Sequence, residues 1–277
     1  MNVRRLLVAA LMAPLLCPAC ASGASTDGAD GERVGSASEA SSFPFVQFGT
    51  RCQETYQNNW YTACSGATAR CTGFQNAVAA QGGLGNYYYN LHGAKSALEN
   101  PDTCGWPCGY VDSVDFFYME THGCRSNTDA CWFMWDTSTR AYSSQMRLGD
   151  SGRENMIFST FSCDTLTLDS YMWTRWSPVL AGGLVMTTGS NDTLYLPSNA
   201  STGADYFNRM SNGEPIAQSW HEAMLAGDSA NMPAVMNTGS NSTDCWNRQA
   251  GVKLSNLLAT PVLRDSAVGY TCFSSWN

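Results

Sequence analysis

The chain has 277 residues, of which 44% are hydrophobic, and a formal net charge of −8 at pH 7. This acidic balance argues against nucleic acid or an anionic membrane surface as a partner. Beyond the N-terminal leader, no stretch approaches the ~20 consecutive apolar residues that a membrane-spanning helix requires.

The N-terminal residues have the pattern of a secretion signal. Two arginines precede an apolar run over 6–16 that is too short to span a bilayer, and small residues flank Cys20 as in a cleavage site. We therefore predict a signal peptide over 1–21 and a secreted or extracytoplasmic protein. A second interpretation stays open, in which Cys20 carries the lipid of a membrane-anchored lipoprotein, although the residues before it fit that motif poorly.

The next segment, 22–42, consists almost entirely of Gly, Ala, Ser, Asp and Glu. Such a segment buries too little apolar surface to offset the entropy of ordering it, so we predict a flexible linker. The remaining residues, 43–277, suit one domain with a sizeable core.

Within this domain, apolar patterning predicts strands that alternate with helices. The expected strands are 43–48, 114–120, 155–162 and 183–188. The expected helices are 67–80, 166–180, 204–210 and 214–225. Alternation of this kind indicates an α/β domain with a mostly parallel sheet that is flanked by helices.

Ten of the twelve cysteines fall within the predicted domain. In an exported protein the default interpretation is a set of disulfides, although spacing alone does not fix their connectivity. The candidate bridges, each close in sequence, are Cys104/Cys108, Cys124/Cys131 and Cys245/Cys272.

A zinc site is an alternative use of some of these residues, because His122 lies close in sequence to Cys124 and Cys131. The chain lacks a paired CxxC framework, however, and an oxidising compartment disfavours thiolate ligands. We predict no metal and no cofactor.

Two chemically reactive residues follow predicted strands directly. His122 and Gly123 come after the strand 114–120, and Cys163 directly follows the apolar run 155–162. Functional groups of parallel sheets collect at the carboxyl ends of the strands. A cysteine nucleophile needs a nearby base and backbone N–H groups that receive the oxyanion. We therefore predict a His122/Cys163 site with the amides of Gly123 and Cys163 as oxyanion donors, since Gly123 has no side chain to block approach.

The two motifs are VDFFYMETHG over 114–123 and MIFSTFSC over 156–163, with Cys163 following His122 by 41 residues. This order resembles the signature of caspase-like cysteine peptidases (clan CD), a group that includes caspases, legumains, gingipains and clostripains. The flanking segments more particularly resemble a bacterial domain family of unknown function with the same His-Gly…Cys pattern. These segments are DSVDFFYMETHG, STFSCDTL, LAGGLVMTTG and PIAQSWHEAM.

The resemblance implies a caspase-like three-layer α/β sandwich and an exported cysteine-dependent hydrolase, most simply an endopeptidase with a peptide or protein substrate. By the same resemblance, Cys163 attacks the scissile carbonyl and His122 protonates the leaving amine. The chain departs from the pattern at Ser162, where peptidases of this clan often have Ala. Neither a cleavage preference nor an oligomeric state follows from the sequence.

Other interpretations of these residues stay open. Ten cysteines can form five bridges, which would consume Cys163 and abolish nucleophilic chemistry. His122 can be a hydrogen-bonded core histidine. The chain would then be a non-catalytic secreted binding domain on the same fold, with some of its nine Trp and twelve Tyr contacting glycan or peptide. The other two histidines, His92 and His221, are predicted to have structural or surface roles.

Overall fold

The structure is a computed structural model. The predicted signal peptide over 1–21, the predicted linker over 22–42, His92, Cys104 and Cys108 lie outside the residues that it describes. The described residues are 46–59, 61–82, 95–99, 114–135, 140–146, 148–149, 155–195 and 201–276.

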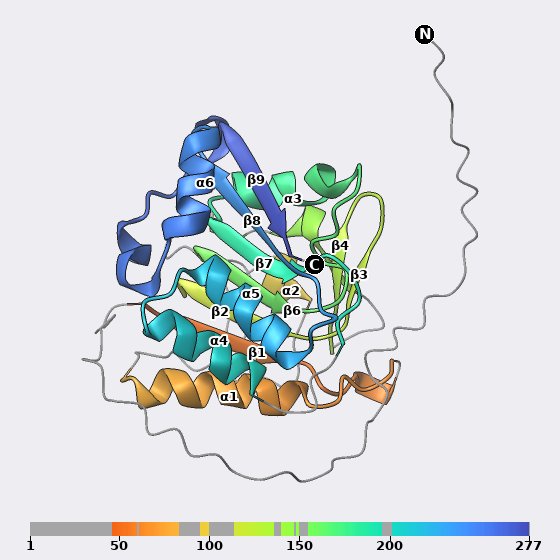
Figure 1. The fold of residues 1–277 in the computed structure, drawn as a ribbon. Coiled ribbons are helices and arrows are strands. Elements are labelled where there is room, and N and C mark those ends of the chain that lie inside the picture. Colours follow the sequence, from red (N-terminus) through yellow and green to blue (C-terminus); the bar gives the residue numbers. More distant parts are fainter. Residues whose placement is uncertain are drawn as a thin grey trace.

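The centre of the fold is a six-stranded sheet with the order β1-β2-β6-β7-β8-β9 (Figure 1). The first four strands in this order run parallel, whereas β8 and β9 are antiparallel to their neighbours. The strands are β1 (Phe48–Cys52), β2 (Phe116–Glu120), β6 (Ile157–Phe161), β7 (Met186–Ser190), β8 (Pro233–Gly239) and β9 (Tyr270–Ser275). The predicted α/β class with a mostly parallel sheet is therefore confirmed.

Helices cover one face of this sheet, and a helix and a small sheet cover the other (Figure 1). The first face carries α1 (Ala67–Ala80), α4 (Thr202–Ser211) and α5 (Ile216–Gly227), and α6 (Ser242–Gly251) packs against β8 and β9. The second face carries α3 (Met172–Ala181) and the antiparallel sheet of β3 (Gly123–Arg125), β4 (Ala130–Phe133) and β5 (Arg140–Tyr142). The remaining short elements are α2 (Ser96–Glu99) and the 3-10 helices Gln57–Asn59, Ser143–Gln145, Leu254–Ala259 and Asp265–Ala267.

Every residue of β2 and of β6 is buried. Strands covered on both faces appear in sequence as nearly continuous apolar runs, which explains why the predictions over 114–120 and 155–162 are confirmed. The strand predicted over 43–48 is displaced, because Val46 and Gln47 precede the strand and β1 occupies Phe48–Cys52; residues 43–45 lie outside the described residues. Thr50 and Arg51 are buried within β1, so its polar residues hid it from a search for apolar runs.

The helix predicted over 67–80 coincides with α1, and those over 204–210 and 214–225 correspond to α4 and α5. The helix predicted over 166–180 begins later, at Met172. The Asp169 carboxylate accepts hydrogen bonds from the backbone of Tyr171 (2.8 Å) and from Arg175 (2.7 Å). This local turn satisfies backbone N–H groups without a helix, so the helix starts after it.

Aromatic side chains fill both layers of the core. On the α1 face, Phe74 stacks on Tyr118 with ring centroids 4.7 Å apart. On the α3 face, Trp132 and Trp176 meet edge to face at 5.8 Å. Each of these two indoles also donates a hydrogen bond, Trp132 to Thr160 (3.0 Å) and Trp176 to the Thr165 carbonyl (2.8 Å), so neither buries an unpaired N–H.

Three disulfides lie within the described residues. The predicted pairs Cys124–Cys131 and Cys245–Cys272 are present, and the third, Cys52–Cys71, joins the last residue of β1 to α1. Disulfides are typical of oxidising, extracytoplasmic compartments. The described residues include no helix with the length and apolar character needed to cross a membrane.

A buried ion pair fastens α1 to the carboxyl end of β2. The Arg70 guanidinium donates to the Glu120 carboxylate and to the Ser65 carbonyl (3.1 Å), and it lies 5.2 Å from the centre of the Phe161 ring. Burial raises the pKa of Glu120 to about 7, and Arg70 opposes this rise. Both side chains are almost inaccessible, so each depends on the other for compensation of its charge.

We expect Arg70→Met to lower the free energy of unfolding at pH 8 by about 3 kcal/mol, because the ionised Glu120 then has no buried cation beside it. At pH 5, below the raised pKa of Glu120, the protonated carboxyl needs no cation and the loss should be smaller. Urea denaturation of the variant and of the unmodified protein at both pH values measures the loss in the free energy of unfolding. The matched control is Arg209→Met, which removes partly exposed ion pairs and should cost less than about 1 kcal/mol. Equal losses for Arg70→Met at the two pH values would contradict a raised pKa of Glu120.

Candidate active site

The register between two neighbouring strands determines the position of the site. β2 and β6 pair in parallel with Glu120 opposite Phe161, and these are the last residues of the two strands. His122 and Cys163 each follow two residues later, so they leave the sheet at the same edge and at the same level. The carboxyl edge of a parallel sheet is where functional groups collect.

Gly123 and Cys163 are in close contact through their backbones. A Cβ atom placed on Gly123 would lie 2.1 Å from the Cys163 carbonyl oxygen and 2.9 Å from its amide nitrogen. No side chain fits within these distances, so glycine is required here by the close approach of the two strand ends. The structure thus places the backbone of Gly123 against that of Cys163, and His122 immediately precedes Gly123 in the chain.

Cys163 is present as a thiol, as is Cys64, whereas the six other cysteines of the described residues form disulfides. The side chain is 4% exposed, and the backbone N–H of Leu194 donates a hydrogen bond to Sγ at 3.4 Å. A hydrogen bond donated to sulfur stabilises negative charge on it. Disulfide formation therefore does not remove Cys163 from chemistry in this structure.

The imidazole of His122 is oriented by a backbone carbonyl. Its Nε2 lies 3.0 Å from the oxygen of Thr62. Because a carbonyl oxygen can only accept, Nε2 carries the proton, and Nδ1 is the nitrogen that can accept a proton from another group. The tautomer is therefore the one in which Nδ1 is basic.

Aromatic rings surround this imidazole. Its centroid is 4.9 Å from that of Tyr61, 5.9 Å from that of Tyr56 and 6.0 Å from that of Phe133. The backbone N–H of His122 donates to the Tyr56 hydroxyl at 3.3 Å. That hydroxyl lies 3.0 Å from Thr121 Oγ1, which in turn donates to the Phe133 carbonyl (2.7 Å). The rings limit the rotation of the His122 side chain, and the hydroxyl network holds its backbone.

The residues that hold His122 come from a segment that sequence reasoning did not connect with the site. Tyr56, Tyr61 and Thr62 lie between β1 and α1. Thr62 acts through its backbone carbonyl, which every residue type has, so its identity carried no signal. Tyr56 and Tyr61 are both aromatic residues in a polar stretch, which is the one hint that the sequence offered.

The structure excludes the zinc alternative at this place. Cys124 and Cys131 are joined in a disulfide, so they cannot supply thiolate ligands beside His122. His221, the third histidine, lies on α5 and stacks on Trp276 at 4.5 Å, in agreement with a structural role.

The site is thus a thiol and an oriented histidine at the ends of adjacent parallel strands, in a three-layer α/β domain. A family model described as "Domain of unknown function (DUF6345)" matches residues 53–251, and the chain belongs to this family. The comparison with curated proteins finds no match.

Similar solved structures include two insect caspases. The Drosophila initiator caspase Dronc is 9% identical, with 68% of this chain and 78% of that chain covered and a TM-score of 0.42. Caspase-1 from Spodoptera frugiperda is 12% identical, with 82% and 85% covered and a TM-score of 0.42. At these identities and TM-scores the likeness assigns no role to His122 or Cys163.

We expect Gly123→Ala to destabilise the fold by about 2 kcal/mol, because the added methyl group overlaps the Cys163 backbone and the strand ends must move apart. Chemical denaturation measures the change. Gly251→Ala is the control, since a Cβ on Gly251 meets no atom within 4 Å and should leave stability almost unchanged. Equal stability of the two variants would show that the strand ends do not touch as described.

Proposed function

We propose that this protein is an exported cysteine-dependent hydrolase, most simply an endopeptidase that acts on peptide or protein substrates. The observation that supports this most strongly is the retention of a thiol at Cys163, whose backbone contacts Gly123 directly after His122, in a domain where six other described cysteines are oxidised. The order of the His-Gly and Cys motifs, which resembles that of caspase-like peptidases, adds to this support.

In the proposed reaction His122 Nδ1 takes the proton of the Cys163 thiol, while Nε2 keeps its hydrogen bond to Thr62. The thiolate attacks the scissile carbonyl carbon and forms a carbon–sulfur bond. The imidazolium then gives its proton to the leaving amine as the carbon–nitrogen bond breaks. Water, activated by the same imidazole, hydrolyses the thioester and regenerates the thiol.

The negative charge on the substrate oxygen needs donors in the transition state. We assign this role to the backbone N–H groups of Gly123 and Cys163. The backbones of these two residues pack against each other, so their amides belong to one rigid unit at the strand ends. Donors that are held in place before the reaction stabilise the oxyanion without a reorganisation cost.

We expect Cys163→Ala and His122→Ala each to reduce hydrolysis of a fluorescent casein substrate by about 1000-fold or more, because each removes a partner of the covalent step. The melting temperatures should stay close to that of the unmodified protein. Cys64→Ser is the matched control, as it removes the other thiol of the described residues and should retain activity. Activity that survives in Cys163→Ala would exclude the mechanism.

A second test measures the reactivity of the Cys163 thiol directly. We expect iodoacetamide at neutral pH to modify Cys163 faster than Cys64, and His122→Ala to slow the modification of Cys163 but not of Cys64. Peptide mass mapping at successive times gives both rates from one sample. Equal rates for the two thiols, unaffected by His122→Ala, would mean that the histidine does not activate the cysteine.

One observation favours a second candidate, a non-catalytic binding domain on the same fold. Cys163 is 4% exposed and belongs to the hydrophobic core cluster, where a thiol also serves as a small apolar side chain. Under this candidate Cys163→Ala changes stability and no hydrolysis is found. The alkylation rates distinguish the two candidates.

A further inference from the structure

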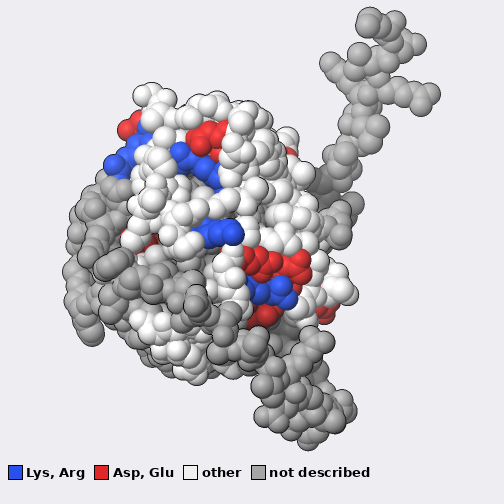
Figure 2. Space-filling view, turned by 60° about the vertical axis from the view of Figure 1, so that its left-hand side comes forward, with Lys and Arg blue, Asp and Glu red and all other residues white. Residues whose placement is uncertain are grey.

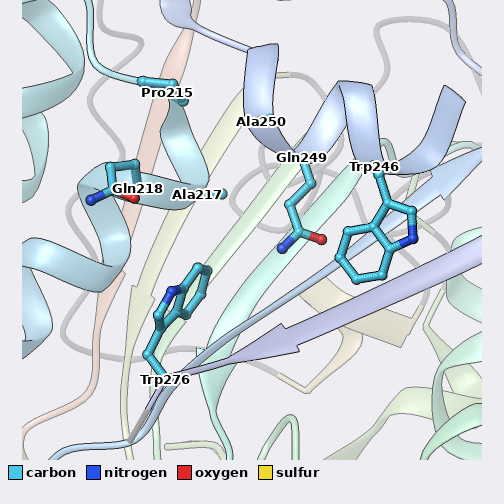
Figure 3. A pocket seen from close by; sticks show the side chains of 7 residues that line it. All are labelled: Pro215, Ala217, Gln218, Trp246, Gln249, Ala250 and Trp276. Atoms are coloured by element: carbon cyan, nitrogen blue, oxygen red, sulfur yellow. The ribbon is translucent and has the colours of Figure 1, made fainter. Parts of the chain in front are cut away.

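A cavity lies away from the His122/Cys163 site, between α5, α6 and the end of the chain after β9. Its volume is about 290 Å³. Its walls are Pro215, Ala217 and Gln218 of the α5 side, Trp246, Gln249 and Ala250 of α6, and Trp276. Figure 3 shows these side chains converging on one space from three segments that are far apart in the sequence.

Two tryptophans form the main walls. The indole of Trp246 is 45% exposed, unlike the fully buried indoles of Trp132, Trp176 and Trp220 that serve the core. Trp276 is held in place because His221 stacks on it at 4.5 Å and its backbone N–H donates to Pro233 (3.1 Å). Large aromatic faces that are open to a cavity and fixed in position offer apolar surface to a ligand.

A polar group between these walls lacks a partner. The Gln249 side chain stands between Trp246 and Trp276, with its amide oxygen on the side of Trp246 (Figure 3). Its nitrogen donates to Ser274, but its oxygen accepts no hydrogen bond, although the residue is only 6% exposed. An unsatisfied buried acceptor has a free-energy cost, so a ligand that brings a donor gains by satisfying it.

The cavity is uncharged. None of the seven residues that line it in the described part of the chain is acidic or basic. The charged side chains of α4 and α6 are compensated locally, as Arg209 pairs with Asp205 (3.0 Å) and Arg248 with Asp244 (3.0 Å). On the face drawn in Figure 2, most of the acidic and basic side chains lie in small mixed groups. A charged ligand would lose its hydration here without gaining a counter-ion.

We propose that this cavity binds a neutral carbohydrate, with a sugar ring against the indoles of Trp246 and Trp276 and a hydroxyl donating to Gln249. A sugar ring has apolar C–H faces and hydroxyl donors at its edge, which match the aromatic walls and the unpaired oxygen. A hydrocarbon supplies no donor, and a proline-rich peptide lacks N–H groups at its prolines. The inference is independent of the proposed hydrolase activity.

The test is isothermal titration calorimetry of the full chain. The neutral probes are cellohexaose, chitohexaose, xylohexaose and mannohexaose. Deca-proline and an oligogalacturonate serve as the apolar and the charged probes. We expect at least one neutral oligosaccharide to bind with a Kd in about the micromolar to millimolar range. The two other probes should bind more weakly or not at all.

Variants locate the binding. We expect Trp246→Ala and Gln249→Leu each to weaken binding by about tenfold or more, because they remove an aromatic wall and the acceptor. Trp173→Ala is the matched control, since this α3 indole is 44% exposed and lies outside the cavity, and it should retain full affinity. Cys163→Ala should also bind normally.

Three outcomes would overturn the proposal. The first is the absence of binding by every neutral oligosaccharide up to about 10 mM, above the weakest affinity considered. The second is equal affinity of the Trp246→Ala and Trp173→Ala variants. The third is tighter binding of deca-proline or of the oligogalacturonate than of any neutral sugar.

Discussion

The pairing of β2 with β6 is the constraint on which the candidate active site depends. The parallel register sets Glu120 opposite Phe161, and the two chains then leave the sheet side by side. The backbone contact between Gly123 and Cys163 leaves no room for a side chain at position 123. The backbones that carry a histidine and a thiol 41 residues apart in sequence thereby leave the sheet at the same level. The sheet therefore determines where the two residues lie, and the segment between β1 and α1 orients the imidazole.

The sequence was sufficient for the parts of the fold that bury apolar runs. Helix α1 was predicted to the residue, and β2 and β6 were recognised because parallel strands covered on both faces are apolar throughout. The antiparallel strands were not predicted. β3 and β5 are three residues long, and β8 ends in Asn, Thr and Gly, so neither length nor pattern identified them. Element boundaries were displaced where a polar residue is buried, as in β1, or where a side chain caps a turn, as at Asp169.

The residues of the two sites also divide into those that the sequence predicted and those that it did not. The placement of His122, Gly123 and Cys163 at the ends of neighbouring strands was predicted from sequence, because these residue types carry chemistry and follow apolar runs. Thr62 was not found, because it acts through a carbonyl that every residue has. The cavity beside Trp246 was not found either, since its walls come from three separate segments that only the folded chain brings together. The parallel half of the sheet thus supports the thiol and the histidine, and the antiparallel half, β8 and β9, supports the cavity.

The Cys52–Cys71 disulfide has a consequence for biochemical work on this protein. It closes a loop over 52–71, and this loop carries Tyr56, Tyr61 and Thr62, which hold the imidazole of His122. Thiol–disulfide exchange needs an attacking thiolate to reach one of the two sulfur atoms. Cys52 and Cys71 are both 0% exposed, so a reductant in solution does not reach this bond while the domain is folded. A mild reductant therefore keeps accessible thiols reduced and leaves the segment beside His122 tied to β1 and α1.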